Sequence, residues 1–470
     1  MKKILYFFIS VFSTYVSAQT YSSQNISLIS LINPNTGTVG VGTDGRRYSG
    51  CWGWKHPLNN KEYAIVGSSI GTYFIDVSNP STPSVSAFVS GRQNNTYREI
   101  KTYQNYCYVA SDDASPNTFQ IIDMTQLPAT VTVVYNGTSY FERGHTIWID
   151  NGNMYIGAAT YSAGGAAFSS LNIYSLATPS APVLMRRLDQ DFPLVTYVHD
   201  MFVRNDTIFA SCGNQGLYIF KWISSTLSFV QLGSYTGYPF AGYNHSSYIT
   251  DDGKKLVFCD ESPTALPIKL VDVQNLANIQ PLTTFKPHAN TTPHNPYVIG
   301  NNLAVVSCYQ DGINIYNISN PNNVFLAGYF DTYPQGGFNT GNYNSADYRG
   351  NWGAYPYLPS GIIIATDMQN GVFILDPSVA NVTGVKSNIN SKTNLMFYPN
   401  PASDKISINY NSSNSSLVQI KNTMGQLIFE KMFNGSIHEY IDVNNFANGT
   451  YIISVYEKDQ TSTKKLIINH

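Results

Sequence analysis

A unit of about 50 residues recurs along most of the chain, and this repeat constrains the fold more than any other feature. Each copy has an apolar strand, a short polar turn and a loop, as in TYFIDVSNPSTP from Thr72 and INIYNISNPNNV from Ile313. Equivalent positions are Asp76, Asp123, Ser175, Lys221, Asp272, Asn317 and Asp376, at steps of 47, 52, 46, 51, 45 and 59 residues. A period of about 40–50 residues is typical of β-propeller blades.

The unit that begins at Pro293 shows the internal order of the repeat. PHNPYVI, LAVVSCY, INIYNI and VFLAGYF are short apolar runs separated by turns rich in Asn, Asp and Gly. Four such strands form one antiparallel blade, so the chain is predicted to be all-β, with a seven-bladed β-propeller. No stretch shows a helical period. The seventh unit is one strand short, and NISLISLI from Asn25 is predicted to complete it.

Four segments are predicted from the composition along the chain. Residues 1–18 have two lysines, an apolar run and a small-residue cleavage site, which is typical of a secretory signal peptide. Residues 19–380 form the propeller and residues 381–393 form a polar linker. Residues 394–470 contain six or seven strand patterns and are predicted to form a small C-terminal β-sandwich.

Charge and hydropathy argue against a nucleic-acid-binding surface and against a transmembrane segment. Charged residues make up 12% of the chain, the net charge is -2, and like charges do not form runs. A nucleic-acid surface is therefore not expected. No apolar run after the leader reaches about 18 residues, so no transmembrane segment is expected.

Several strings between residues 50 and 376 carry a resemblance to known secreted propellers. They include CWGWKHPLNNKEYAIVG, YREIKTYQNYCYVASDD, YNHSSYITDDGKKLVFCDES and NWGAYPYLPSGIIIATDMQNGVFILD. With these strings the chain resembles the LVIVD-repeat proteins, and more closely the choice-of-anchor B family of secreted bacterial proteins. The resemblance implies a propeller fold and no established activity.

The C-terminal segment carries a second resemblance. Its motifs are Tyr398, Pro399, Asn400 and Pro401, then MGQLI from Met424, NGTYIISV from Asn448 and the terminal KKLIINH. With these motifs it resembles the sorting domain of type IX secretion, found in Bacteroidetes. The resemblance implies that the type IX machinery is a partner, and that the chain is secreted or held at the outer-membrane cell surface.

Histidines and carboxylates recur at two positions of the repeat. His145, His199, His245 and His294 stand at the start of the first strand in successive units, and Glu99 stands there in the second unit. Acidic residues follow the second strand; they are Asp260, Glu261, Asp311 and Asp367, with Asp112 and Asp113 earlier in the chain. In a blade these two positions lie on the same face, so both sets, with Asp200 beside His199, are predicted to meet at one mouth of the channel.

Three interpretations of this cluster remain open. Neutral imidazoles and carboxylates bind transition metals, so His199, His245 and His294 are candidate ligands of a divalent metal, the one cofactor suggested. The same groups would serve as a general acid and base. Alternatively, each histidine hydrogen-bonds the neighbouring blade and pins the central strands.

Two functions follow from these interpretations. The first is an exported binding scaffold whose channel holds an extracellular glycan, polymer or protein. The second is an extracellular propeller enzyme, a metal-dependent hydrolase or oxidoreductase, that uses the ring of histidines and carboxylates. The first is favoured, because the fold alone does not indicate catalysis and the sequence contains no recognised catalytic motif.

Overall fold

The computed structural model describes residues 20–38, 41–42, 44–95, 97–113, 115–161, 167–336, 348–383, 395–410, 414–422, 426–457 and 460–470. The chain divides into two compact units, one ending at Gly384 and the other beginning at Val385. The predicted signal peptide, residues 1–18, and residues 384–393 of the predicted linker lie outside the described residues.

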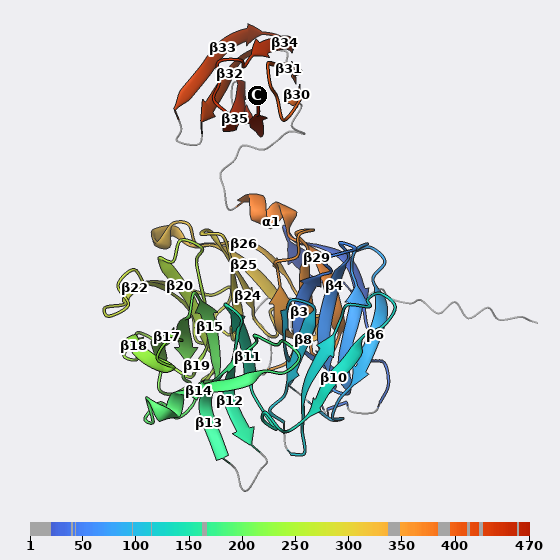
Figure 1. Cartoon of the computed structure of the whole chain (residues 1–470), viewed down its shortest axis with the longest axis vertical. Helices are drawn as coiled ribbons and strands as arrows, with labels where there is room; N and C mark the ends of the chain where they lie inside the picture. The colour runs from blue at the N-terminus through green and yellow to red at the C-terminus, as the bar shows by residue number, and fades with distance from the viewer. Residues whose placement is uncertain are drawn as a thin grey trace, which may run out of the picture. The chain divides into compact units, whose positions relative to one another are not determined.

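Antiparallel sheets, most of them four-stranded, make up the first unit (Figure 1). The first four sheets contain β3 (Tyr48–Lys55), β4 (Glu62–Ser68), β5 (Gly71–Asp76) and β6 (Ser84–Ser90); β7 (Glu99–Tyr103), β8 (Tyr106–Ala110), β9 (Phe119–Asp123) and β10 (Thr132–Gly137); β11 (Thr146–Asp150), β12 (Asn153–Tyr161), β13 (Ala167–Ser175) and β14 (Val183–Arg187); and β15 (Asp200–Arg204), β16 (Thr207–Ser211), β17 (Leu217–Ile223) and β18 (Ser228–Tyr235). The others contain β19 (Asn244–Ile249), β20 (Lys255–Asp260), β21 (Ile268–Asp272) and β22 (Gln280–Phe285); β23 (Pro296–Ile299), β24 (Leu303–Ser307), β25 (Ile313–Asn317), β26 (Phe325–Phe330) and β1 (Ser23–Gln24); and β27 (Asn351–Tyr355), β28 (Ile363–Asp367), β29 (Gly371–Asp376) and β2 (Ser27–Ile32). Short 3-10 turns lie at Leu188–Gln190, Pro321–Asn323 and Pro334–Gly336.

Contacts between successive sheets close into a ring. β3 contacts β7, β7 contacts β11, and the series continues through β15, β19 and β23. β27 then contacts both β24 of the preceding sheet and β3 of the first sheet. The first unit is therefore a β-propeller in which the first strand of each sheet is innermost. The repeat is confirmed at the level of strands, because Asp76 and Asp272 are the last residues of the third strands β5 and β21.

The N-terminal segment completes the last sheet of the ring. β2 pairs with β29, which confirms that NISLISLI supplies the missing strand. β1 adds a further, unexpected pairing to β26 of the preceding sheet. Ile26, between β1 and β2, is 2% exposed and lies in one core cluster with Phe330 and Phe373. Two sheets are thus joined through the start of the chain.

A short helix, α1 (Ser378–Thr383), follows β29 where the sequence predicted no helix and assigned residues from 381 onward to the linker. Ala380 is fully buried, and its N–H donates to the carbonyl oxygen of Asn25 at 3.0 Å. The helix also contacts β26. Its contacts are therefore tertiary, and a local sequence period does not reveal it.

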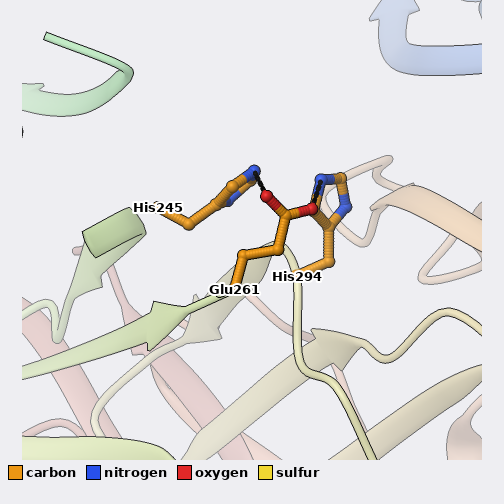
Figure 2. Close-up of side chains that lie close together, drawn as sticks. All are labelled: His245, Glu261 and His294. Atoms are coloured by element: carbon orange, nitrogen blue, oxygen red, sulfur yellow. Dashed lines mark ion pairs between the residues drawn. The ribbon is translucent and has the colours of Figure 1, made fainter. Parts of the chain in front are cut away.

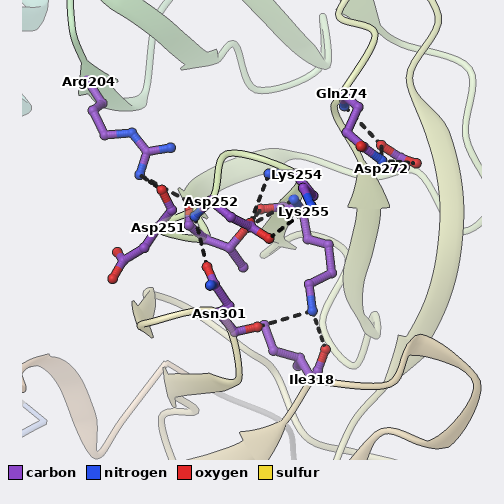
Figure 3. A network of polar contacts seen from close by, with 10 residues as sticks. Arg204, Asp251, Asp252, Lys254, Lys255, Asp272, Gln274, Asn301 and Ile318 are labelled. Atoms are coloured by element: carbon purple, nitrogen blue, oxygen red, sulfur yellow. Dashed lines mark hydrogen bonds and ion pairs between the residues drawn. The ribbon is translucent and has the colours of Figure 1, made fainter. Parts of the chain in front are cut away.

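Hairpin turns of neighbouring sheets are linked by polar contacts away from the histidines (Figure 3). Arg204 donates to the carbonyl oxygen of Thr250 at 3.0 Å, and the Asp252 N–H donates to the Asn301 side chain at 2.8 Å. Lys255 donates to the carbonyl oxygen of Ile318 at 2.6 Å. Gly253 has a φ of +73°, a left-handed conformation that glycine adopts readily in a tight turn. These contacts hold three successive sheets in register.

The second unit has two antiparallel sheets around one apolar core. One sheet contains β30 (Met396–Tyr398), β31 (Lys405–Tyr410) and β34 (Ile437–Asp442), and the other contains β33 (Leu427–Asn434), β32 (Ser415–Asn422), β35 (Gly449–Glu457) and β36 (Gln460–Ile468). Ile408 of the first sheet and Val418 and Ile453 of the second are fully buried in this core. Such packing is typical of a β-sandwich.

Candidate functional site

The four histidines stand at equivalent places at the inner edge of successive sheets. The backbone N–H groups of His145, His199 and His294 each donate to the second strand of the same sheet, at 3.0, 2.8 and 2.8 Å. His245 is the extra residue of a β-bulge, because Asn244 pairs with Asp260 and Ser246 with Cys259. A β-bulge changes the direction in which the side chains of its strand point, here that of His245. Trp352 is the extra residue of a similar bulge in β27 and takes the corresponding place in the last sheet.

The imidazole rings form a continuous row. Ring centroids are 4.1 Å apart between His145 and His199, and 4.3 Å apart both between His199 and His245 and between His245 and His294. Trp352 extends the row, 4.7 Å from His294. His199, His245 and His294 are buried, and His145 is half-buried. The structure thus brings together all four predicted histidines.

The Nδ1 atom of each ring is engaged in a hydrogen bond. Nδ1 of His199 donates to the carbonyl oxygen of His245 at 3.1 Å, and Nδ1 of His294 donates to that of Trp352. The Ser246 hydroxyl donates to the carbonyl oxygen of His294 at 2.6 Å, so its oxygen accepts the Nδ1–H of His245 at 3.0 Å. The acceptors of His199 and His294 belong to the next sheet, so these two histidines hydrogen-bond the neighbouring blade, whereas His245 bonds within its own sheet. Their Nε2 atoms carry lone pairs.

Burial sets the charge of the row. It lowers the pKa of His294 to about 3 and the pKa values of His199 and His245 well below the usual value. Burial also opposes protonation of His145, but the Asp112 carboxylate, which accepts its Nδ1–H, raises the net pKa of that ring. At neutral pH three imidazoles are therefore neutral.

Glu261 lies between two of the histidines (Figure 2). Its Oε2 is 3.8 Å from Nε2 of His245, and its Oε1 is 4.0 Å from Nε2 of His294. Tyr309, which is 2% exposed, donates its phenol O–H to Oε1. Burial raises the pKa of Glu261, although this hydrogen bond opposes the shift. Among the described residues, His245, Glu261 and His294 each offer one possible metal-ligand atom, and these atoms lie within 4.8 Å of one another.

A cavity of about 70 Å³ opens beside the histidine row. The row, Trp352 and Tyr97 line it together with Glu99, Lys101 and Asp200 from the inner strands. Lys101 is buried, forms an ion pair with Glu99, and places Nζ 4.4 Å from the Trp52 ring centroid. Burial and the charge of Glu99 raise the pKa of Asp200 to about 7. The cavity thus combines neutral imidazoles, one ion pair and a carboxyl group that titrates near neutrality.

We expect the variant D200N to be more stable than the wild type at pH 8 by up to about 4 kcal/mol and nearly equal to it near pH 4. The folded-state pKa of about 7 lies above the ordinary 3.8, so only the folded state holds the proton between these values. The contribution of Asp200 to the free energy of unfolding therefore falls as the pH rises from about 4 to about 7. Urea unfolding at both pH values measures the difference. An equal difference at both would contradict the prediction.

Three of the predicted carboxylates lie away from the cavity lining. Asp260 is fully buried and binds Lys269 at 2.9 Å. Asp367 accepts from the Thr332 hydroxyl at 2.7 Å and from two backbone N–H groups in its turn, and burial raises its pKa to about 7. Asp311 is also fully buried, in the turn after β24. In the structure these side chains organise turns and sheet interiors.

Some site residues were missed by the sequence analysis. Tyr97 and Tyr309 are far in sequence from Trp352 and Glu261, which they contact, and no motif marks Lys101, although its partner Glu99 is two positions away. Trp52 and Trp352 lie in the strings CWGWKHPLNNKEYAIVG and NWGAYPYLPSGIIIATDMQNGVFILD, and both line the cavity. Trp52 also packs on Tyr355 of β27, with ring centroids 4.7 Å apart.

The sorting motif begins the second unit. Tyr398 ends β30 with a side chain that is 60% exposed. The Asn400 side chain donates to the carbonyl oxygen of Lys465 at 3.0 Å and accepts from the N–H of Ile467 at 2.8 Å. This residue therefore joins the start of the sandwich to its last strand.

Comparison with known families concerns the second unit. Residues 396–469 match the secretion system C-terminal sorting domain. This type IX sorting domain indicates that the protein is exported, to the cell surface or the medium, through interaction with the secretion machinery. In the described residues, no helix has both the length and the apolar character needed to cross a bilayer.

One relative is similar over a short segment of sequence, and two solved structures are similar at low sequence identity. Ulvan lyase NLR42 of Nonlabens ulvanivorans is 38% identical over 73 residues, which are 15% of this chain and only 14% of that protein. PorZ of Porphyromonas gingivalis, a type IX secretion component, has 11% identity and a TM-score of 0.47, covering 90% of this chain and 60% of its own. The WD40 propeller domain of Doa1 has 10% identity and a TM-score of 0.49, covering 78% of this chain and 99% of its own.

Proposed function

We propose that this protein is an exported seven-bladed β-propeller that binds a neutral extracellular glycan at the mouth of its channel. The propeller of residues 19–380, with the LVIVD-repeat and choice-of-anchor B character of its strings, would follow a cleaved signal peptide of residues 1–18. A linker of residues 381–393 would join it to the sorting domain of residues 394–470. Export through that domain would place the channel mouth outside the cell.

One observation carries the proposed activity: the cavity combines aromatic faces with a few polar groups. Tyr97 and Trp352 lie 5.0 Å apart, both partly exposed, beside the histidine row and the carboxyl groups. Ligand sites combine aromatic walls with a few placed polar groups in this way. The cationic side chains of the lining, Arg98 and Lys101, stand against the carboxyl groups of Glu99 and Asp200, so the net charge of the lining is small and a neutral glycan fits better than a strongly anionic polymer.

Affinity electrophoresis through gels that contain single neutral polysaccharides tests this function. We expect at least one polysaccharide to retard the exported chain, and W352A to bind it at least tenfold more weakly, or by about 1.4 kcal/mol. The matched control is Y440A, which removes an exposed aromatic side chain of the second unit and should leave retardation unchanged. Equal retardation of W352A, or no retardation by any gel, would refute the proposal.

A second candidate is an extracellular propeller enzyme, a metal-dependent hydrolase or oxidoreductase. The hydrogen bond between Asp112 and His145 favours it, because a carboxylate that orients an imidazole is a common arrangement for general acid–base catalysis. His199 lies next to this pair, with ring centroids 4.1 Å apart. A glycan held at the mouth would then be a substrate.

A further inference from the structure

We propose that His245, Glu261 and His294 bind one divalent transition-metal ion at the channel mouth. The inference goes beyond glycan binding and uses the same mouth as the functional face. It differs from the set predicted from the sequence, in which His199 stood in the place of Glu261.

The hydrogen bonds establish which nitrogen atoms are available. A carbonyl oxygen only accepts, so Nδ1 of His294 carries its proton toward Trp352. Ser246 has one hydroxyl proton, which goes to the carbonyl oxygen of His294, so Nδ1 of His245 must also be a donor. In the neutral tautomers, Nε2 of both rings is left with a lone pair directed to the carboxylate. Bonds of this kind from Nδ1 fix metal-binding histidines in many proteins.

The distances from the two Nε2 atoms to the Glu261 carboxylate oxygens favour a cation bound between these groups. At 3.8 and 4.0 Å, the pairs of Nε2 and carboxylate oxygen exceed hydrogen-bond range, and each pair brings two acceptors face to face. Two atoms bound to one tetrahedral zinc ion lie about 3.4 Å apart, since each bond is about 2.1 Å. The donor atoms lie within 4.8 Å of one another, so a closure of up to about 1.4 Å brings all three into range.

The surroundings hold the three ligands in place. His245 and His294 are 5% and 1% exposed, and both rings pack in the imidazole row. Tyr309 donates its phenol O–H to the carboxylate and so orients it, and its ring centroid lies 4.5 Å from that of His294. Two imidazoles and one carboxylate suit Zn²⁺ and its neighbours rather than Ca²⁺ or Mg²⁺, and they leave a fourth position open to water or a ligand.

Metal binding to the full exported chain tests the site, with Zn²⁺ as the probe and Ca²⁺ as the comparison. After removal of metals with EDTA, we expect isothermal titration and elemental analysis to show one bound Zn²⁺ per chain and no bound Ca²⁺. H245A/H294A should lose this binding. E261Q and the positioning variant Y309F should weaken it by about 10–100-fold. H438A, which removes an exposed histidine of the second unit, should bind as the wild type does.

Folding is checked in the same samples by near-UV circular dichroism. Because E261Q keeps the shape of the side chain, it tests the site even if the double histidine variant fails to fold. Absence of stoichiometric Zn²⁺ from the wild type, or unchanged affinity in folded E261Q, would overturn the proposal. Retardation by polysaccharide gels is measured without added metal, so glycan binding and metal binding fail or succeed separately.

Discussion

Deletion of residues 20–32 should remove at least about 5 kcal/mol from the free energy of unfolding of the propeller. The deletion exposes the edge of β29 and removes Ile26, together with Ile29 and Ile32, which pack on a neighbouring core cluster. Burying one isoleucine side chain contributes about 1.5–3 kcal/mol. The loss is comparable with the whole stability of many domains, about 5–15 kcal/mol, so the shortened protein should be largely unfolded or aggregated. Tryptophan fluorescence during urea unfolding measures this.

Point variants separate the side-chain part of this effect from the pairing of strands. I26A should cost about 2–5 kcal/mol, since the residue is 2% exposed. The matched control L31S changes an apolar residue of β2 that is 39% exposed and should cost less than about 0.5 kcal/mol. An unfolding midpoint unchanged by the deletion would show that β2 does not close the ring.

The variant K269M should destabilise the propeller by about 3–5 kcal/mol. The side chains of Lys269 and Asp260 are 3% and 0% exposed and lie 2.9 Å apart, so the substitution leaves a buried carboxylate without its cation. Tyr238, Asn244 and the N–H of Gly242 continue to donate to that carboxylate, at 2.9–3.2 Å. Chemical unfolding gives the size of the loss. Because Asp260 directly precedes Glu261, the same variant should also weaken Zn²⁺ binding.

Two comparisons make the Lys269 result specific. The double variant D260N/K269M removes both charges and should recover most of the lost stability. K61A breaks an ion pair with Asp76 whose lysine is 41% exposed, and should cost no more than about 1 kcal/mol. A loss for K269M as small as that for K61A would mean that solvent or rearrangement compensates the buried charge.

The propeller was predictable because its signals are local and repeated. Third strands end at a polar residue before a turn, as at Asp123 and Asn317, except β17, which continues past Lys221 to Ile223, and the spacing of these positions indicates the blades. The histidine row was predictable for the same reason, since equivalent residues of a ring come close together. The completion of the last sheet by β2 was inferred from a missing strand rather than from any contact signal.

The partners of the histidines were not predictable, because they depend on geometry between sheets. A bulge shifts the register by one residue, so the correspondence of Trp352 with His245 cannot be counted from the period. Neighbouring acidic residues also diverge: Asp260 points into its own sheet toward Lys269, while Glu261 reaches two histidines. Tyr309 meets Glu261 across 48 positions of sequence.

The pairing of β2 with β29 also has a consequence for folding kinetics. Ser27 pairs with Asp376, so the contact that closes the ring joins nearly the two ends of the propeller sequence. Contacts of such high contact order form slowly, because the loop-closure entropy must be overcome before the pairing is gained. An emerging chain cannot make this contact until the last sheet has been synthesised. Until then β2 lacks the strand with which it pairs, and ring closure is expected to be the rate-limiting step of folding.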